Sequence, residues 1–334
     1  REHLAILDLL GIEHGVVALS KSDLVDDEWR AFVVEATRDL LDGTSLASAE
    51  IVPVSSVTGE GLDELRSALD RALAPIERQG RGSFPRLPID RVFSLSGFGT
   101  VVTGTLLDAP LRIGDRVEIL PGGLSSRVRG MQTFGKTVEL AEPGSRVAVN
   151  VTGLETSELA RGDVLTYSGA MRPAMRLDIR VQILESSERP LAHNDEVILF
   201  AGSSETPAKV ALLDRDAIEP GEAGLVQLRL ARPVAVEPRD LFILRRPSPP
   251  ETIGGGVVLE LDAARHKRFQ PAVIDRLHQL NAGDPADALL AWLGNRFVSE
   301  QELRMQGQAG MAGELLAAGR IKCVGPVEGR ICAA

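Results

Sequence analysis

Two short polar segments follow two apolar runs, and together their residues could recognise a purine base. Ser20-Lys21-Ser22-Asp23 comes directly after the apolar run 16–19, and Ser55-Ser56 comes after the run 51–54. The carboxyl ends of parallel strands meet at one edge of an open α/β sheet, which is where such sheets bind ligands. There the Asp23 carboxylate can accept hydrogen bonds from the N1–H and the exocyclic amine of guanine. Adenine has an acceptor at N1 and no amine at C2, so it would leave that carboxylate unpaired.

The neighbouring residues have matching roles in this interpretation. The aliphatic stem of Lys21 can cover the face of the base while its ammonium stays in water. A backbone N–H near Ser56 can donate to guanine O6. A Lys-x-Asp triplet by itself favours a plain polar turn before a helix, but two such loops one βα unit apart favour a guanine site. The candidate guanine-binding residues are Ser20, Lys21, Asp23, Ser55 and Ser56.

Other motifs indicate structure more than chemistry. The segment 97–104, Gly-Phe-Gly-Thr-Val-Val-Thr-Gly, is not a phosphate-binding loop, because such a loop opens a helix and β-branched residues follow here. It predicts a glycine-bearing bulge between strands. The three glycines 254–256 predict a bulge or a turn. The five histidines show no metal-ligand spacing, and we expect no metal site.

Composition excludes several classes of protein. Lys plus Arg number 37 and Asp plus Glu number 47, which gives a net charge of −10. Such a chain is not, as a whole, a nonspecific binder of nucleic acid or membrane surfaces. No apolar window reaches the ~18 residues of a membrane span. Two cysteines, Cys323 and Cys332, exclude a disulfide framework and a four-cysteine zinc site, and they favour a reducing cytoplasm.

The hydrophobic pattern predicts a multidomain fold in four parts. Residues 1–78 alternate helix and strand, which predicts a parallel α/β sheet. Residues 84–172 and 173–263 are rich in short alternating runs and predict two antiparallel β-barrels, with strands over 100–105, 116–120, 146–151, 176–184 and 224–230. Residues 264–334 become helical again and end in a hairpin over 320–324 and 329–331, which favours a winged-helix unit. Apolar stripes there are Ala288, Leu289, Trp292 and Leu293, then Met311, Leu315 and Leu316, with a possible capping box from Ser299 to Glu302.

This order of parts resembles the translational GTPases related to elongation factor Tu. The runs Leu87–Arg91, Val226–Leu230 and Arg245–Gly256 resemble, more closely, the selenocysteine-specific elongation factors, whose hallmark is a winged-helix tail. The resemblance implies a GTP-binding domain half followed by two barrels. It also implies GTP and Mg²⁺ as cofactors, and selenocysteinyl-tRNA, the ribosome and a selenocysteine-insertion hairpin in messenger RNA as partners of the intact protein.

The resemblance also assigns residues. Lys21 and Asp23 match the guanine-specificity motif and Ser55-Ser56 the supporting loop, while Ser20 replaces the usual Asn or Thr. Asp90, Arg91 and Arg146 match the positions that line the selenocysteinyl pocket. A selenol is more acidic than a thiol and is largely anionic at neutral pH, so two guanidinium groups favour it over the neutral hydroxyl of serine. The alternative is that both arginines merely pair with surface carboxylates.

Several segments of the family are not found in these residues. The phosphate loop, the magnesium-binding switch and the stretch with the catalytic histidine are all expected before Arg1, and His3 is not that histidine. We therefore expect a fragment truncated at both ends, with no catalytic residue and no GTP hydrolysis of its own. We further expect a monomeric cytoplasmic protein that does not enter membranes.

Two other functions remain open. One is a different translational GTPase related to elongation factor Tu, against which the tail after Pro271 argues. The other is a non-catalytic RNA-binding fragment built from barrels and a winged helix. The pair of guanine loops argues against that second alternative as an ancestral role.

Overall fold

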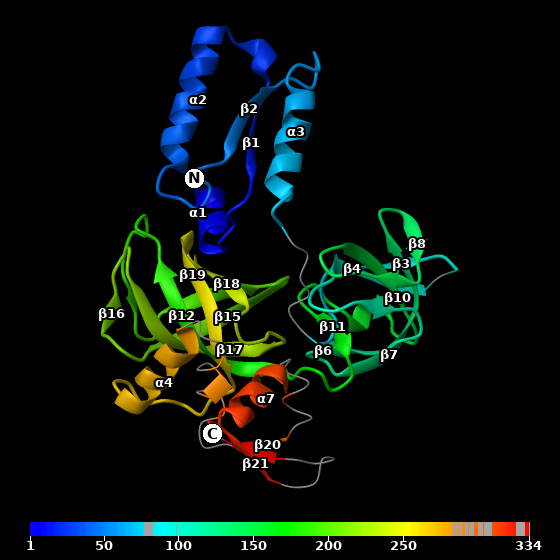
Figure 1. Ribbon diagram of the computed structural model, residues 1–334, viewed down its shortest axis with the longest axis vertical. Coiled ribbons are helices and arrows are strands. Elements are labelled where there is room, and N and C mark those ends of the chain that lie inside the picture. The colour runs from blue at the N-terminus through cyan, green and yellow to red at the C-terminus, as the bar shows by residue number, and fades with distance from the viewer. Residues whose placement is uncertain are drawn as a thin grey trace. The chain divides into compact units, whose positions relative to one another are not determined.

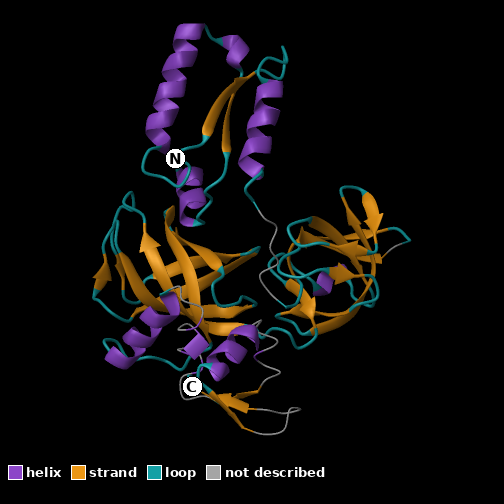
Figure 2. Cartoon of the chain, viewed as in Figure 1, coloured by secondary structure: helices purple, strands orange, loops and turns teal. Residues whose placement is uncertain are grey.

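The computed structural model describes residues 1–76, 83–97, 99–282, 286, 289–290, 293, 297–299, 303, 309–324 and 331–333. The chain divides into two compact units, Arg1–Arg78 and Gln79–Ala334 (Figure 1). The first unit mixes helices and strands, whereas most of the second is β-structure (Figure 2). The change of hydrophobic period near residue 80 therefore marks a real change of architecture.

The first unit is a small parallel sheet with helices on both faces. Its elements are α1 (Glu2–Leu9), β1 (Val16–Ser20), the 3₁₀ turn η1 (Ser22–Leu24), α2 (Asp27–Leu41), β2 (Glu50–Val54) and α3 (Leu62–Leu73). β1 and β2 pair in parallel from Val16 opposite Glu50 to Ser20 opposite Val54. Alternation along β2 sends Val52 and Val54 toward Ala68 of α3 and sends Ile51 toward Leu41 of α2. The predicted strands and helices of this unit are confirmed.

The first barrel contains six main strands. These are β3 (Arg86–Leu95), β4 (Gly99–Thr105), β6 (Arg116–Leu120), β7 (Leu124–Thr133), β10 (Arg146–Val151) and β11 (Val164–Tyr167). Their order is β10-β4-β3-β11-β6-β7, and pairing of β7 with β10 closes the ring. The barrel also has three short strands and one 3₁₀ turn, which are β5 (Leu111–Arg112), β8 (Lys136–Val138), β9 (Leu140–Ala141) and η2 (Thr156–Glu158). Inward-facing Leu87, Val102, Ile119, Val147 and Leu165 fill the core.

The second barrel is also closed and six-stranded. It consists of β12 (Ala174–Ile183), β14 (Glu196–Ala201), β15 (Ser204–Leu212), β17 (Ala223–Val234), β18 (Leu241–Pro247) and β19 (Pro250–Leu261), in the order β12-β17-β15-β14-β18-β19. Short β13 (Leu191–Ala192) and β16 (Ala217–Ile218) pair beside it. The all-β prediction is thereby confirmed.

The three glycines of β19 do not form the turn that was one expectation for them. They lie inside the strand, next to a register shift opposite Leu244 and Arg245. A Cβ on Gly254 would lie 2.2 Å from the carbonyl oxygen of Gln182, and one on Gly256 would lie 2.0 Å from that of Arg180. Glycine is needed here because the β12 backbone approaches closely.

The two barrels contact each other through a largely buried arginine. Arg86 of β3 donates from Nη1 and Nη2 to the Asp240 carboxylate at 2.7 and 2.9 Å, and from Nε to Asp108. A bidentate pair of this kind fixes geometry as well as charge. A separate apolar cluster of Phe84, Leu120, Val164, Met171 and Ala235 also joins residues of both barrels.

The tail contains helices and a small sheet. α4 (Pro271–Asn281) packs Leu277 and Leu280 onto the second barrel. β20 (Val298–Ser299), β21 (Lys322–Val324) and β22 (Ile331–Ala333) form a sheet in the order β20-β22-β21, beside α7 (Ala309–Ala317). The predicted hairpin is present.

Ser299 ends a strand, while Glu302, Ala288, Trp292, Gly329, Arg330, Phe98 and residues 79–82 lie outside the described residues.

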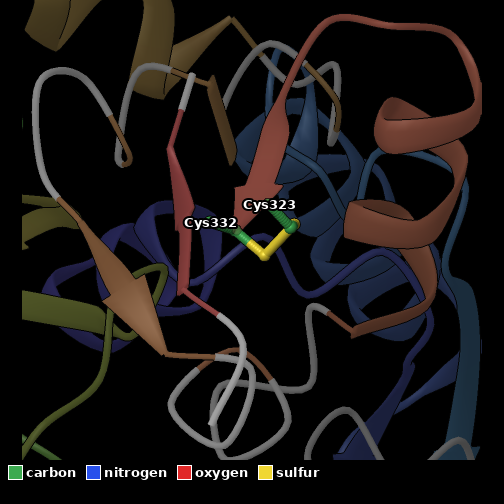
Figure 3. The surroundings of a disulfide bond; sticks show 2 residues. All are labelled: Cys323 and Cys332. Carbon is green, nitrogen blue, oxygen red and sulfur yellow. A yellow bond between two sulfur atoms is a disulfide. The ribbon is translucent and has the colours of Figure 1, made fainter. Parts of the chain in front are cut away.

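The two cysteines form a disulfide across the hairpin (Figure 3). Cys323 of β21 lies directly opposite Cys332 of β22, with their Cα atoms 4.0 Å apart. The count of two cysteines excluded a framework of several bridges, but this single bridge was not expected. Only the strand register brings the two thiols together, and their spacing in the sequence does not reveal it.

Within the portion of the chain that the structure describes, we find no helix with the length and apolarity needed to span a membrane.

Candidate functional site

The two predicted guanine loops leave the same edge of the sheet. Ser20, the last residue of β1, pairs with Val54, the last residue of β2, so the loops begin side by side. Lys21 has a left-handed backbone with φ of 65°, which turns the chain sharply into η1. The Asp23 side chain is exposed and makes no hydrogen bond or ion pair with the residues that the structure describes. A free carboxylate therefore lies at the place where the sequence predicted one.

The second loop is shaped by Ser55. Its side chain is fully buried, and its Oγ accepts hydrogen bonds from the backbone N–H groups of Val57 and Thr58 at 3.2 and 3.1 Å. Ser56 beside it is exposed. Ser55 thus holds the loop in shape, while Ser56 lies on the open side.

Arg30 of α2 contacts both loops and was missed by the sequence analysis. Its Nη2 donates to the backbone oxygen of Ser22 at 3.4 Å, and its Nη1 donates to Glu60 at 3.2 Å. Ser22 belongs to the first loop and Glu60 to the second. The arginine therefore links the two loops, and no motif in the sequence signals that role.

A second polar cluster lies on three adjacent strands of the first barrel. Arg146 of β10 donates to both carboxylate oxygens of Asp90, from Nη1 at 2.5 Å and from Nη2 at 2.9 Å. The hydroxyl of Thr103 on β4 donates to Asp90 at 2.8 Å and accepts from Arg146 at 3.3 Å. We call Asp90, Thr103 and Arg146 the carboxylate–arginine cluster. Two of its members were predicted and Thr103 was missed.

A bulge in β3 positions Asp90. Ile89 pairs with Gly104 and Arg91 pairs with Thr103, which leaves Asp90 as the extra residue. Bulges re-aim a side chain in this way next to functional sites. Gly104 lets the strands approach, since a Cβ there would lie 2.2 Å from the carbonyl oxygen of Pro88.

Asp90 and Arg146 are both ionised near neutral pH, and Arg91 beside the cluster adds a second positive charge. Hydrogen bonds from Arg146 hold the pKa of Asp90 below its ordinary value, helped by Thr103 and by the charge of Arg91. The same pair raises the pKa of Arg146. One carboxylate beside two guanidinium groups offers an acceptor for an amine and a net positive charge for an anion.

A cavity of about 350 Å³ opens on the same barrel. Its walls include Ser94 of β3, Thr100 of β4 and Asn150 of β10, the strands that also carry the carboxylate–arginine cluster. Thr100 Oγ1 donates to the backbone oxygen of Leu154 at 2.6 Å, which joins the loop at the edge of the cavity to the barrel. The size is in the range of small-molecule sites.

A third group of polar side chains is buried in the second barrel. Asp178, Glu260 and His266 bring their ligand atoms within 4.8 Å of one another. Both carboxylates have protein partners, because His266 Nε2 lies 2.7 Å from Asp178 and Arg276 pairs with Glu260 at 2.6 Å. We therefore describe this group as an ion-pair network. The sequence analysis did not find it because 88 residues separate Asp178 from His266.

The α/β half domain followed by two closed barrels is shared with known translation factors. Elongation factor Tu 2 of Streptomyces avermitilis is 30% identical to this chain over 276 residues, covering 78% of this chain and 70% of that protein. The chain therefore belongs to the translation elongation factors related to elongation factor Tu.

Within that class, the second barrel is diagnostic. Residues 178–265 match the family described as the selenocysteine-specific elongation factor, beta-barrel domain. The selenocysteine-specific elongation factor of Desulfomicrobium baculatum is 40% identical over 311 residues, covering 93% of this chain. These similarities confirm the resemblance to the selenocysteine-specific elongation factors that the sequence indicated. This chain spans 47% of the length of that relative.

Solved structures agree with this assignment. A bacterial selenocysteine-specific elongation factor matches with a TM-score of 0.77 and 26% identity, covering 92% of this chain and 50% of that one. The factor SelB from Methanococcus maripaludis, in complex with the GTP analogue GppNHp, matches with a TM-score of 0.69 and 26% identity, covering 80% of this chain and 62% of that one. The predicted fold class is confirmed.

Proposed function

We propose that this chain is part of a GTP-dependent elongation factor that delivers selenocysteinyl-tRNA to the ribosome for selenocysteine insertion. The observation that carries the proposal is the carboxylate–arginine cluster with Arg91 beside it. A selenocysteinyl ester carries an amine and a selenol that is mainly ionised at neutral pH. The Asp90 carboxylate suits the amine, and the guanidinium groups of Arg91 and Arg146 suit the selenolate.

The cavity supports the same assignment. An aminoacyl group is esterified to the terminal nucleoside of its tRNA, so a pocket for the side chain needs a nucleoside site nearby. The 350 Å³ cavity shares strands β3, β4 and β10 with the cluster and is lined by polar residues that include Ser94 and Asn150.

The first unit supports a guanine nucleotide as the cofactor. Lys21, Asp23 and Ser56 lie on adjacent loops, with the Asp23 carboxylate open and Ser55 shaping the second loop. These residues fit the base and not the phosphates. The one segment with phosphate-loop spacing, Gly130–Thr137, lies in the β7–β8 hairpin of the first barrel and opens no helix, so it is not a phosphate loop. GTP phosphates and Mg²⁺ would be held by other segments of the intact protein. Bound GTP supplies the free energy of hydrolysis that makes delivery directional.

The remaining partners follow from the same proposal. The intact protein would bind the ribosome and, through winged helices, a selenocysteine-insertion hairpin in messenger RNA. It would act as a monomer in the cytoplasm.

The test compares two arginine variants in the full-length protein. We expect Arg146→Ala to weaken binding of selenocysteinyl-tRNA more than binding of seryl-tRNA on the same tRNA body. Arg189→Ala is the matched control, since Arg189 also pairs with an aspartate and its side chain is 59% exposed, against 50% for Arg146. An equal loss for both aminoacyl-tRNAs would show that Arg146 does not read the side chain.

A further inference from the structure

Three unpaired arginines lie together on the outer surface of the first barrel. Arg116 of β6 lies directly opposite Arg127 of β7 in the antiparallel ladder, and Arg129 follows on the same strand. All three are exposed, and none makes a hydrogen bond or ion pair from its side chain to any residue that the structure describes. We call them the arginine row.

This arrangement lowers the stability of the protein when no partner is bound. Like charges directly opposite on neighbouring strands are destabilising. The chain as a whole carries a net charge of −10, so three neighbouring positive charges without acidic partners contrast with the rest of the protein. A surplus of positive charge at one place on an acidic protein indicates an anionic partner.

The acidic residues next to the row accept hydrogen bonds from other groups. Asp115 accepts from the backbone of Arg112 and from the Tyr167 hydroxyl, at 2.8 and 3.0 Å. Glu118 accepts from the backbone of Gly169 at 3.0 Å. Among the described residues, neither carboxylate forms an ion pair with the row, so the three guanidinium groups can contact a ligand.

A β-bulge in the backbone of β7 sets the position of one member of the row. Asn150 pairs with Gly130 and Val151 with Val128, which leaves Arg129 as the extra residue of a β-bulge. The bulge places Arg129 at the wall of the 350 Å³ cavity. The adjoining loop is fixed by Ser126 Oγ, which donates to the backbone oxygen of Thr152 at 2.8 Å. The position of the row is therefore set by the strand register and by this hydrogen bond.

We propose that Arg116, Arg127 and Arg129 bind successive phosphates of an RNA backbone, separately from the carboxylate–arginine cluster. Cross-strand side chains lie about 5 Å apart and alternate residues along a strand lie about 7 Å apart, so a single nucleic-acid strand can contact all three. The choice of RNA over another polyanion rests on the proposed function. The RNA is either the bound tRNA or ribosomal RNA, which present the same phosphodiester chemistry.

The test replaces all three arginines of the full-length protein by glutamine, which keeps part of each aliphatic stem. Binding of deacylated tRNA and of purified ribosomes is measured over a range of salt concentrations. Three lost phosphate contacts should reduce the slope of log K against log salt by about 2 to 3 and weaken binding roughly tenfold at moderate salt. A matched triple variant, Arg161→Gln, Arg172→Gln and Arg189→Gln, removes the same charge from other exposed positions.

The two probes separate the sources of RNA. A loss confined to tRNA, or confined to ribosomes, supports the proposal and identifies the partner. Slopes equal to those of the control variant with both probes would overturn it. The preference of the same variant for selenocysteinyl-tRNA over seryl-tRNA tests the proposed function independently, because the row lies outside the carboxylate–arginine cluster.

Discussion

The side chain of His266 lies 2.7 Å from the carboxylate of Asp178, which is completely buried in the second barrel. Gln227 donates to the other oxygen of that carboxylate at 2.9 Å and to the backbone oxygen of Ala264 at 3.1 Å. The segment that follows β19 is thus held against β12 and β17. Arg276 of α4 adds a pair with Glu260, so the start of the tail is joined to the barrel by polar contacts as well as by Leu277.

We predict that His266→Ala destabilises the protein strongly. The substitution leaves the Asp178 carboxylate buried with one donor fewer, and breaking such a pair costs about 3 kcal/mol. Urea unfolding measures this loss. His278→Ala removes an exposed histidine of α4 and is the control. Equal midpoints for the two variants would contradict a stabilising role for the network.

Glu237 gives the barrel interface a dependence on pH. Burial raises the pKa of Glu237 to about 7 from an ordinary value of 4.5, although Arg86 opposes the shift. Because the folded state binds this proton more tightly than the unfolded state does, Glu237 stabilises the fold most below pH 4.5. That stabilisation is lost as the pH rises to about 7. Glu237→Gln is neutral at every pH and should remove that decline, which amounts to at most ~3 kcal/mol.

Thermal unfolding at several pH values tests this prediction. The wild-type protein should lose stability relative to Glu237→Gln between pH 4.5 and about 7. Glu219→Gln, at an exposed turn, should follow the wild-type curve. Parallel curves for Glu237→Gln and the wild type would show that the pKa of Glu237 is the same in the folded and unfolded states.

Thr103 should contribute to selection of the aminoacyl group. Thr103→Val keeps the shape of the side chain but removes the hydroxyl that contacts both Asp90 and Arg146. We expect the preference of the full-length protein for selenocysteinyl-tRNA over seryl-tRNA to fall about tenfold or more, since one lost hydrogen bond to a charged group costs about 1.5–3 kcal/mol. Thr105→Val, two residues along and exposed, is the control. Equal preference in both variants would remove Thr103 from the pocket.

Asp23 should determine which base is bound. Asp23→Asn in the full-length protein replaces one acceptor by a donor, which suits the second carbonyl of xanthine. We expect the preference for GTP over XTP to fall at least ~10-fold, measured by competition for a fluorescent nucleotide. Asp39→Asn, exposed on α2, controls for the lost charge. An unchanged preference would place Asp23 outside the base site.

Much of the fold was determined by local patterns in the sequence. The apolar run 16–19 became β1, and the alternating run 146–151 became β10. Trp29, Phe32 and Leu40 recur at helical spacing in the sequence, and they lie within α2. In β10 the alternation also marks the buried face, since Val147 and Val149 are fully buried. In α2 the spacing predicted the helix but not its buried face, because Trp29, Phe32 and Leu40 are exposed and Leu41 is buried. The order of the elements then predicted the parallel sheet and the two barrels.

The sequence also located part of the candidate site. Asp23 and Ser56 were identified because each follows a strand, and the ends of parallel strands must meet. Asp90 and Arg146 were identified only through resemblance to a family. Their separation along the chain carries no signal of contact, and the bulge that aims Asp90 toward Arg146 is not visible in the pattern.

Only the tertiary structure decided which distant side chains meet. Thr103 joined the carboxylate–arginine cluster, Arg30 linked two loops, and Cys323 met Cys332 through strand register. It likewise brought Arg116 opposite Arg127 and His266 onto Asp178. A sequence states which residues are polar, but hydrogen bonds and ion pairs act over about 3 to 4 Å, so their partners are set by the packing of elements that are distant in the chain.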